Sequence, residues 1–195
     1  MARRRARFLA WFRAVPLGVV LALGAASCVY RYAPALLFKG LYQLEYETYI
    51  ADACERHGVD PYLVAAIIES ESDWVDGAES TKGAMGLMQL MPETAQQMAS
   101  WGLVDAEAYP YEDLTDPITN IEYGCAFLAY LCDYYDGDVD KVIAAYNAGM
   151  GNVNAWLDSD AAFIDAIAFP ETQAYLLKVR AAYSRYQDLY PDAFE

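Results

Sequence analysis

The stretch of sequence that decides the fold is residues 60–74: Asp60-Pro-Tyr-Leu-Val-Ala-Ala-Ile-Ile-Glu-Ser-Glu-Ser-Asp-Trp74. Asp60 is a favourable N-cap and Pro61 a favourable first helical residue, so the sequence predicts a helix that begins there. With about 100° between successive residues, one face of this helix is apolar and Glu71 falls near its centre. The apolar residues of that face are Leu63, Val64, Ile67 and Ile68. Glu69 falls on the opposite side, which predicts that it points to solvent.

A carboxyl group on an apolar helix face suggests chemistry. Removal from water raises the pKa of a carboxyl group, and a general acid has to be protonated near neutral pH. Glu71 is therefore a candidate general acid. The alternative is that the helix ends by Ser70 and that Glu71 frays into water, and this segment alone leaves both interpretations open.

The rest of the chain also reads as short helices, and no alternating run is long enough to predict a strand. Capping residues and glycines set the expected bounds, with Asp116 and Asp138 as N-caps and Gly58 and Gly137 as stops. The predicted helices are 48–57, 61–72, 92–101, 117–135, 139–147, 151–157 and one from 170 onward. In the last helix, Tyr175 lies in a stripe predicted to face the core. The sequence predicts one all-α domain over residues 45–195.

Two glycine-containing stretches interrupt the predicted helices, residues 76–91 and residues 147–151. Glycine permits positive φ and close approach of the backbone to another group, and functional residues concentrate in such loops. Taken singly, each stretch could equally be a simple turn.

Charge is divided sharply along the chain, which has a formal net charge of −15. Residues 1–39 contain seven basic residues and no acid, and the remainder contains all 28 acidic residues. A domain this acidic is a poor nucleic-acid binder, because phosphate binding needs a basic footprint. Anionic lipids and anionic wall polymers should also repel it, so short-range contacts are expected to hold its substrate.

The N-terminal segment predicts export. Residues 14–30 carry no charge and would span about 26 Å as a helix, at the short end of what crosses a bilayer. The arginines before it place residues 1–13 in the cytoplasm. We expect residues 14–31 to form a single-pass signal-anchor helix and residues 32–44 a linker, with the domain on the wall side. A cleaved signal peptide and lipid attachment at Cys28 remain alternatives.

The four cysteines are too few to form a disulfide framework. Cys125 and Cys132 would lie about 10.5 Å apart along one helix, too far to bond each other. Cys54 could pair with either of them, or all could be free thiols. His57 is the single histidine, and the sequence offers no metal cluster, no Ser/His/Asp or Cys/His nucleophile and no phosphate loop. We therefore expect neither a metal nor another cofactor.

Several motifs along the chain occur together in a known family. They are Glu71-Ser72-x-Trp74, Ser80, Gly86-Leu-Met-Gln-Leu-Met-Pro92, Ala145-Tyr-Asn-Ala-Gly149 and Pro170-Glu-Thr172. In order and approximate spacing, they resemble the soluble (Slt)-type lytic transglycosylases, which share the lysozyme-like fold of goose-type lysozyme. The resemblance covers nearly all of residues 58–190.

The resemblance implies cleavage of the β-1,4 bond between N-acetylmuramic acid and N-acetylglucosamine in peptidoglycan, leaving a 1,6-anhydro end. Glu71 takes the catalytic position. An ordinary retaining glycosidase needs a second carboxylate about 5 Å away, and no second acid has a comparable setting here. A substrate-assisted route removes that need: the sugar's N-acetyl carbonyl attacks the anomeric carbon, and Glu71 acts first as acid and then as base.

The resemblance also implies the residues that contact substrate, and each has a structural alternative. Ser80 and Gln89 match polar groups beside the acid but could merely satisfy loop backbone groups. Met88 and Met91 match a pair at the cleft floor but could fill the core. The remaining matches are Tyr146, which would position the N-acetyl group, Asn147, which would contact sugar, and Glu171, which could instead be a helix-terminal acid.

Two other functions remain open at this stage. A muramidase would use water instead of the C6 hydroxyl, and a binding module would keep the cleft without catalysis. The expected partners are peptidoglycan glycan strands and the membrane, and the chain is expected to be a monomer.

Overall fold

A computed structural model describes residue 27, residues 38–159 and residues 161–194. The contacts divide the chain into two units, Met1–Gln43 and Leu44–Glu195. Of the first unit, the structure describes Ser27 and a helical turn at residues 38–41, where the rings of Phe38 and Tyr42 stack. The second unit contains the helical domain.

The predicted anchor at residues 14–31 lies, apart from Ser27, outside the described residues. Among the helices that the structure describes, none combines the length and the apolar character that a membrane span requires.

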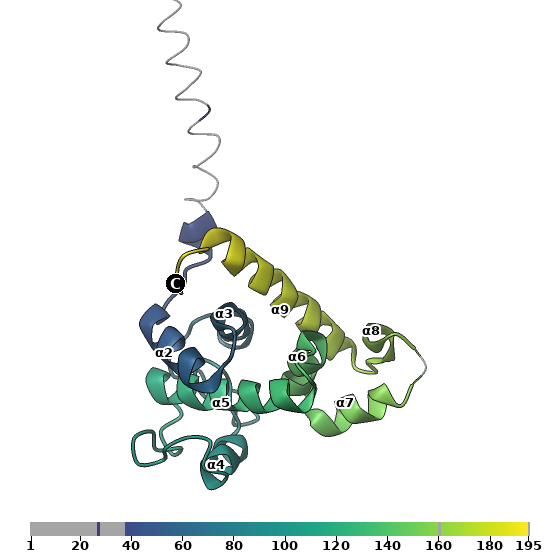
Figure 1. Cartoon of the computed structure of the whole chain (residues 1–195), viewed down its shortest axis with the longest axis horizontal. Coiled ribbons are helices and arrows are strands. Elements are labelled where there is room, and N and C mark those ends of the chain that lie inside the picture. The colour runs from purple at the N-terminus through teal and green to yellow at the C-terminus, as the bar shows by residue number, and fades with distance from the viewer. Residues whose placement is uncertain (1–26, 28–37, 160, 195) are drawn as a thin grey trace, which may run out of the picture. The chain divides into compact units, whose positions relative to one another are not determined.

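The second unit is built from helices throughout, and the described residues contain no strand, so the all-α prediction is confirmed for them (Figure 1). The helices are α2 (Glu47–His57), α3 (Pro61–Glu71), α4 (Pro92–Ser100), α5 (Pro117–Tyr134), α6 (Val139–Ala148), α7 (Met150–Leu157), α8 (Phe163–Ala166) and α9 (Pro170–Leu189). The four-residue helix α8 is the one that the sequence did not predict. Within the part of the chain that the structure describes, two isolated bridges have the hydrogen-bond pattern of paired strands, Glu79 with Met85 and Met85 with Leu90.

Capping explains where the helices begin and end. The side chain of Asp60 accepts a hydrogen bond from the backbone N–H of Tyr62 at 2.8 Å, and Asp116 and Asp138 cap α5 and α6 in the same way. These side chains satisfy backbone donors that have no partner inside the helix. Gly58 ends α2 at φ 69°, a left-handed conformation that glycine adopts at little cost. The predicted caps are confirmed.

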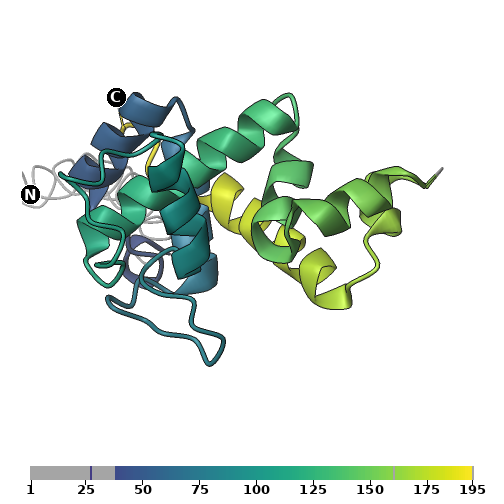
Figure 2. The ribbon, with the colours of Figure 1, turned by 90° about the horizontal axis from the view of Figure 1, so that it is seen from below.

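The core lies around α3, whose residues Leu63–Ile68 are all buried. Figure 1 shows α3 between α2 and α9, with α5 below it, and α3 packs against both α2 and α9. Figure 2 shows α5 running across the view, and α5 packs against α4 and α6, while α6 in turn packs against α7 and α9. The last residue of α3 is therefore surrounded by elements from distant parts of the chain.

A buried carboxylate joins α2 to α5. Glu122 is 3% exposed and contacts Arg56 Nη2 at 2.5 Å and His57 Nε2 at 2.8 Å. Burial by itself would raise the pKa of Glu122, but hydrogen bonds and charge from His57 and Arg56 outweigh it, so this pKa lies below its ordinary value. The single histidine therefore has a structural partner.

Candidate active site

Glu71 is the last residue of α3, and its side chain is half-buried. Its Oε1 accepts a hydrogen bond of 2.6 Å from the hydroxyl of Tyr175 on α9. The chain turns sharply just beyond it, because Asp73 and Trp74 both have positive φ, 52° and 64°. Non-glycine residues rarely adopt that conformation, and such strain gathers at functional sites. The alternative in which Glu71 frays into water is wrong.

The surroundings of Glu71 favour its protonated form. Burial raises the pKa of its carboxyl group, while the hydrogen bond from Tyr175 and the positive charge of Lys178 oppose that shift without cancelling it. Lys178 is itself held in place, because its Nζ donates to the backbone carbonyl of Ser70 at 2.8 Å. A carboxyl group whose pKa is raised keeps its proton to higher pH than an ordinary Glu, which is the direction that a general acid requires.

Two tyrosines belong to the electrostatic environment of Glu71. Burial, followed by the negative charge of Glu71, raises the pKa of both Tyr146 and Tyr175 well above the ordinary value. Both hydroxyls therefore stay protonated and act as donors. Tyr146 on α6 donates to the backbone carbonyl of Met88 at 2.8 Å, and its ring lies 5.4 Å from that of Phe127.

Tyr175 is a candidate functional residue that the sequence analysis missed. It was predicted only as part of a core-facing stripe, and its hydroxyl instead meets the carboxyl group of Glu71, 104 residues earlier in the chain. Helical periodicity showed which face Tyr175 occupies, but not which helix lies opposite. The one signal available was a polar hydroxyl within an apolar stripe, which needs a partner when buried.

Ser80 and Gln89 close the loop that lies beside α3. Ser80 Oγ accepts from the backbone N–H of Ala84 at 2.9 Å. Gln89 Nε2 donates to the carbonyls of Ala78 and Gly86 at 3.0 and 2.9 Å, and the backbone of Gln89 has a φ of 48°. Both side chains thus satisfy loop backbone groups, and their contacts with substrate stay predictions.

Asn120 on α5 holds the Gly86–Met91 turn in place. It is fully buried, its Oδ1 accepts from the backbone N–H of Met88 at 2.7 Å, and its Nδ2 donates to the carbonyls of Met85 and Leu114. A Cβ at Gly86 would come within 2.2 Å of Asn120 Nδ2, so only glycine fits there. Asn120 lies outside the sequence motifs and was not among the predicted site residues.

The two methionines differ in exposure. Met88 is fully buried, and a Cβ at Gly124 would come within 2.0 Å of its Sδ, whereas Met91 is 38% exposed. The backbone carbonyl of Met88 accepts the hydrogen bond from the Tyr146 hydroxyl, while the side chain of Met91 is open to solvent. Their roles toward substrate stay predictions.

Asn147 lies near the end of α6 and Glu171 in the first turn of α9. The hydroxyl of Thr172 donates to Asn147 Oδ1 at 2.9 Å, and Glu171 is the neighbour of Thr172 in the first turn of α9. The side chains of Asn147 and Glu171 are exposed, so both are open to a ligand. The structure thus joins Asn147 to the first turn of α9, which also carries Glu171.

The prediction for Glu69 is wrong. Its side chain is 11% exposed and forms an ion pair with Arg185 of α9, and it also bonds to the hydroxyl of Tyr186. The helical angle was correct, but α9 covers the side of α3 on which Glu69 lies. Tyr186 in turn accepts a hydrogen bond of 2.8 Å from Trp74 Nε1.

The sequence matches the family model described as transglycosylase SLT domain over residues 48–169. The soluble lytic murein transglycosylase of Escherichia coli (strain K12) is 39% identical over 129 residues, which cover 62% of this chain and 20% of that protein. The membrane-bound lytic murein transglycosylase C of Edwardsiella ictaluri is 37% identical over 128 residues, which cover 60% and 34% respectively. The chain thus spans about a fifth to a third of the length of these curated relatives.

Solved structures agree with this match. The 70 kDa soluble lytic transglycosylase from Escherichia coli superposes with a TM-score of 0.72 at 30% identity, covering 80% of this chain and 26% of that one. An inactive mutant of the lytic transglycosylase Slt from Pseudomonas aeruginosa gives a TM-score of 0.68 at 30% identity, covering 75% and 24%. The family model matches the sequence from α2 to α8. The solved structures superpose on 75–80% of this chain.

Proposed function

Because this chain belongs to the transglycosylase SLT domain family, we propose that it cleaves the glycan strands of peptidoglycan as a lytic transglycosylase. The observation that supports this most is the setting of Glu71: a half-buried carboxyl group with a raised pKa that receives a hydrogen bond from Tyr175. The relatives that it resembles are named as lytic murein transglycosylases. The bond cleaved is the β-1,4 linkage between N-acetylmuramic acid and N-acetylglucosamine.

In the first step, Glu71 protonates the glycosidic oxygen as the bond to the anomeric carbon breaks. The N-acetyl carbonyl of the same sugar attacks that carbon, so the protein needs no carboxylate nucleophile. Glu71 is then a carboxylate. The hydrogen bond from the Tyr175 hydroxyl and the positive charge of Lys178 both favour this form. Both interactions strengthen as negative charge develops, as stabilisation of a transition state requires.

In the second step, the Glu71 carboxylate accepts the proton of the C6 hydroxyl while that oxygen attacks the anomeric carbon and closes the 1,6-anhydro ring. The bond between the N-acetyl oxygen and the anomeric carbon breaks as the new bond forms, which restores the N-acetyl group. No water is added. Tyr146 orients the N-acetyl group in this proposal. What supports this role is that its hydroxyl donates to the backbone carbonyl of Met88, so the phenol oxygen can still accept from an N–H group of the sugar. Ser80, Gln89, Met91, Asn147 and Glu171 complete the proposed substrate contacts.

The matched pair Glu71→Gln and Glu69→Gln tests the proposed roles on purified peptidoglycan. Loss of a general acid is worth about 10²–10⁴-fold in rate, so we expect Glu71→Gln to lose at least about 100-fold and Glu69→Gln to stay near the parent. The measurement is release of soluble fragments, with product masses read by mass spectrometry. A Glu71→Gln variant that digests as fast as the parent would show that Glu71 is not the acid.

Product mass separates the candidate reactions. Fragments that end in 1,6-anhydro-N-acetylmuramic acid support the transglycosylase, whereas fragments heavier by one water would identify a muramidase. Binding of peptidoglycan without any fragment release would identify an inactive binding module.

The location that we infer for this reaction is the wall side of the cell membrane. The support is the charge division of the N-terminal segment, basic residues followed by the uncharged run of residues 14–30. One relative is named as membrane-bound. Recovery of the full chain in the soluble fraction of lysed cells would contradict the proposed anchor.

A further inference from the structure

Two cysteines that are 71 residues apart in the sequence face each other in the core. Cys54 lies on the inner face of α2 and Cys125 on α5, both are buried, and their Sγ atoms are 4.0 Å apart. A disulfide requires about 2.0 Å between the sulfurs. The remaining movement of about 2 Å is of the size that rotation about a Cα–Cβ bond produces.

The setting of the pair favours thiol chemistry over metal binding. Within residues 38–159 and 161–194, no three His, Cys, Asp or Glu side chains are placed to hold a metal ion. Burial raises the pKa of the Cys125 thiol well above its ordinary value, so Cys125 is a poor nucleophile while it is reduced. An oxidant would therefore have to be attacked first by Cys54.

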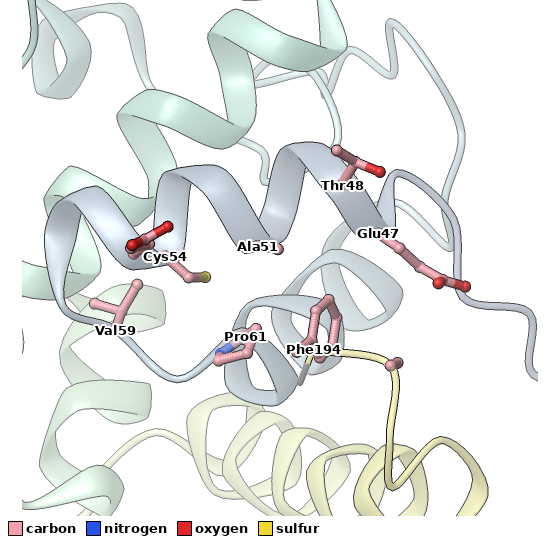
Figure 3. A pocket seen from close by; sticks show the side chains of 9 residues that line it. Glu47, Thr48, Ala51, Cys54, Val59, Pro61 and Phe194 are labelled. Atoms are coloured by element: carbon pink, nitrogen blue, oxygen red, sulfur yellow. The ribbon is translucent and has the colours of Figure 1, made fainter.

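A surface pocket borders Cys54, which is 4% exposed, and is the side from which an oxidant would approach it. The pocket has a volume of about 580 Å³ and is formed by α2, the start of α3 and residues near the C-terminus. Cys54 lies in its wall, with Val59, Pro61 and Phe194 around it (Figure 3). The sulfur atom of Cys54 points into this space, as Figure 3 shows. None of the residues of the candidate active site lines the pocket.

We propose that Cys54 and Cys125 form a disulfide bond that links α2 to α5 in the working protein. The oxidant is a disulfide of the exported compartment, carried by a protein or by a small thiol. The Cys54 thiolate attacks one sulfur of that disulfide and releases its other half as a thiol. Cys125 then loses its proton and attacks the Cys54 sulfur, which releases the second half. The pair loses two electrons and two protons, and the carrier gains them.

The compartment in this proposal rests on the proposed function, because disulfides persist outside the cytosol. The effect of the bond on stability does not depend on the proposed function. The bond would close a loop that contains α3, Glu71, the loop of residues 76–91 and α4. A cross-link across such a loop restricts the unfolded chain and stabilises the fold. We expect oxidation to raise Tm by on the order of 10 °C.

The test is peptide mapping by mass spectrometry of the full chain. The reduced protein is incubated with oxidised glutathione, denatured with N-ethylmaleimide and digested. We expect a linked peptide pair containing Cys54 and Cys125, with Cys132 modified by maleimide. Alkylation of both Cys54 and Cys125, or glutathione on Cys54 as the final product, would overturn the proposal. This test measures peptide masses and not enzymatic activity, so its result does not depend on whether the protein cleaves peptidoglycan.

Matched variants complete the design. Cys132→Ser should keep the linked peptide and the rise in Tm, since Cys132 lies two turns further along α5. Cys125→Ala should lose both, and its Tm should not respond to reductant. The same map on chain exported by a bacterial host tests the compartment: linkage there supports the proposal, and two free thiols there overturn it.

Discussion

At the scale of the residue, Glu71 shows what a helical pattern can predict and what it cannot. The pattern placed its carboxyl group on the apolar face of α3, and the side chain is indeed half-buried there. The pattern could not identify Tyr175, whose hydroxyl lies 2.6 Å from Glu71 Oε1. The partner comes from a helix that begins almost 100 residues later, and only tertiary packing brings the two together.

Tyr175→Phe tests the link between this hydrogen bond and the pKa of Glu71. Burial raises that pKa and the Tyr175 hydrogen bond lowers it, so removing the hydroxyl should raise it further. Glu71 then stays protonated to higher pH, and the alkaline limb of the activity profile should move to higher pH. The maximal rate should fall roughly 10–100-fold, the value of one hydrogen bond to a charged group.

Tyr183→Phe is the matched control, because it removes a phenol from the same helix whose hydrogen bond goes to Asp60 instead. Its pH–rate profile should coincide with that of the parent. A Tyr175→Phe profile that coincides with the parent, or that moves to lower pH, would contradict the role given to Tyr175.

At the scale of the element, α9 determines the surroundings of both acids on α3. Tyr175 meets Glu71 near one end of the contact, and Arg185 meets Glu69 further along. The sequence predicted α9 and its apolar stripe, but not that it would cover the side of α3 that carries Glu69. An acid that a helical projection assigns to solvent is instead part of the contact between two helices.

Glu69→Gln should therefore lower stability and leave activity near that of the parent, whereas Glu71→Gln should lower activity without lowering stability. Glu69→Gln removes the ion pair with Arg185 of α9, which should cost about 1–3 kcal/mol of unfolding free energy and roughly 2–10 °C in Tm. Glu71→Gln removes a carboxyl group that burial disfavours when charged, so its Tm should be unchanged or higher. Thermal unfolding at pH 7 measures both, and a Tm of Glu69→Gln equal to the parent would contradict the role assigned to the pair.

The turn at Gly86–Met91 shows a second limit of prediction from sequence motifs: the residue that holds a loop can lie outside the motif. Its glycines and its string of residues pointed to a functional loop, but the side chain that fixes it is Asn120 on α5, outside the motif. Sequence reasoning found the segment because its composition is unusual. It missed the anchor because an asparagine inside a long helix looks like any other polar residue.

At the scale of the whole molecule, the ion pairs of Glu122 make stability depend on pH. Its pKa is lowered in the folded protein, so its contribution is complete above the unfolded pKa and is lost as pH falls through the lower folded pKa. At pH 7 we expect Glu122→Gln to lower Tm by roughly 2–10 °C. The difference between parent and variant should shrink as pH falls below the ordinary Glu pKa of 4.5.

Thermal unfolding from pH 7 to pH 3 measures this difference. Glu55→Gln provides the control, since Glu55 is exposed on α2 and should give a constant, small offset. A difference for Glu122→Gln that stays constant through that range would show that the carboxylate is not held by Arg56 and His57.

The sequence by itself determined the local structure of this protein. Proline, aspartate and glycine at helix ends set the helix boundaries within one or two residues, because capping and backbone conformation depend on near neighbours. The spacing of short motifs also predicted the family, which the family match confirms, and it predicted Glu71 as the catalytic acid. The tertiary structure alone decided the partners: Tyr175 at Glu71, Arg185 at Glu69, Asn120 at the Gly86 turn and Cys125 opposite Cys54. The physical reason is that these contacts join residues far apart in the chain, and periodicity gives the face of a helix but not the element that covers it.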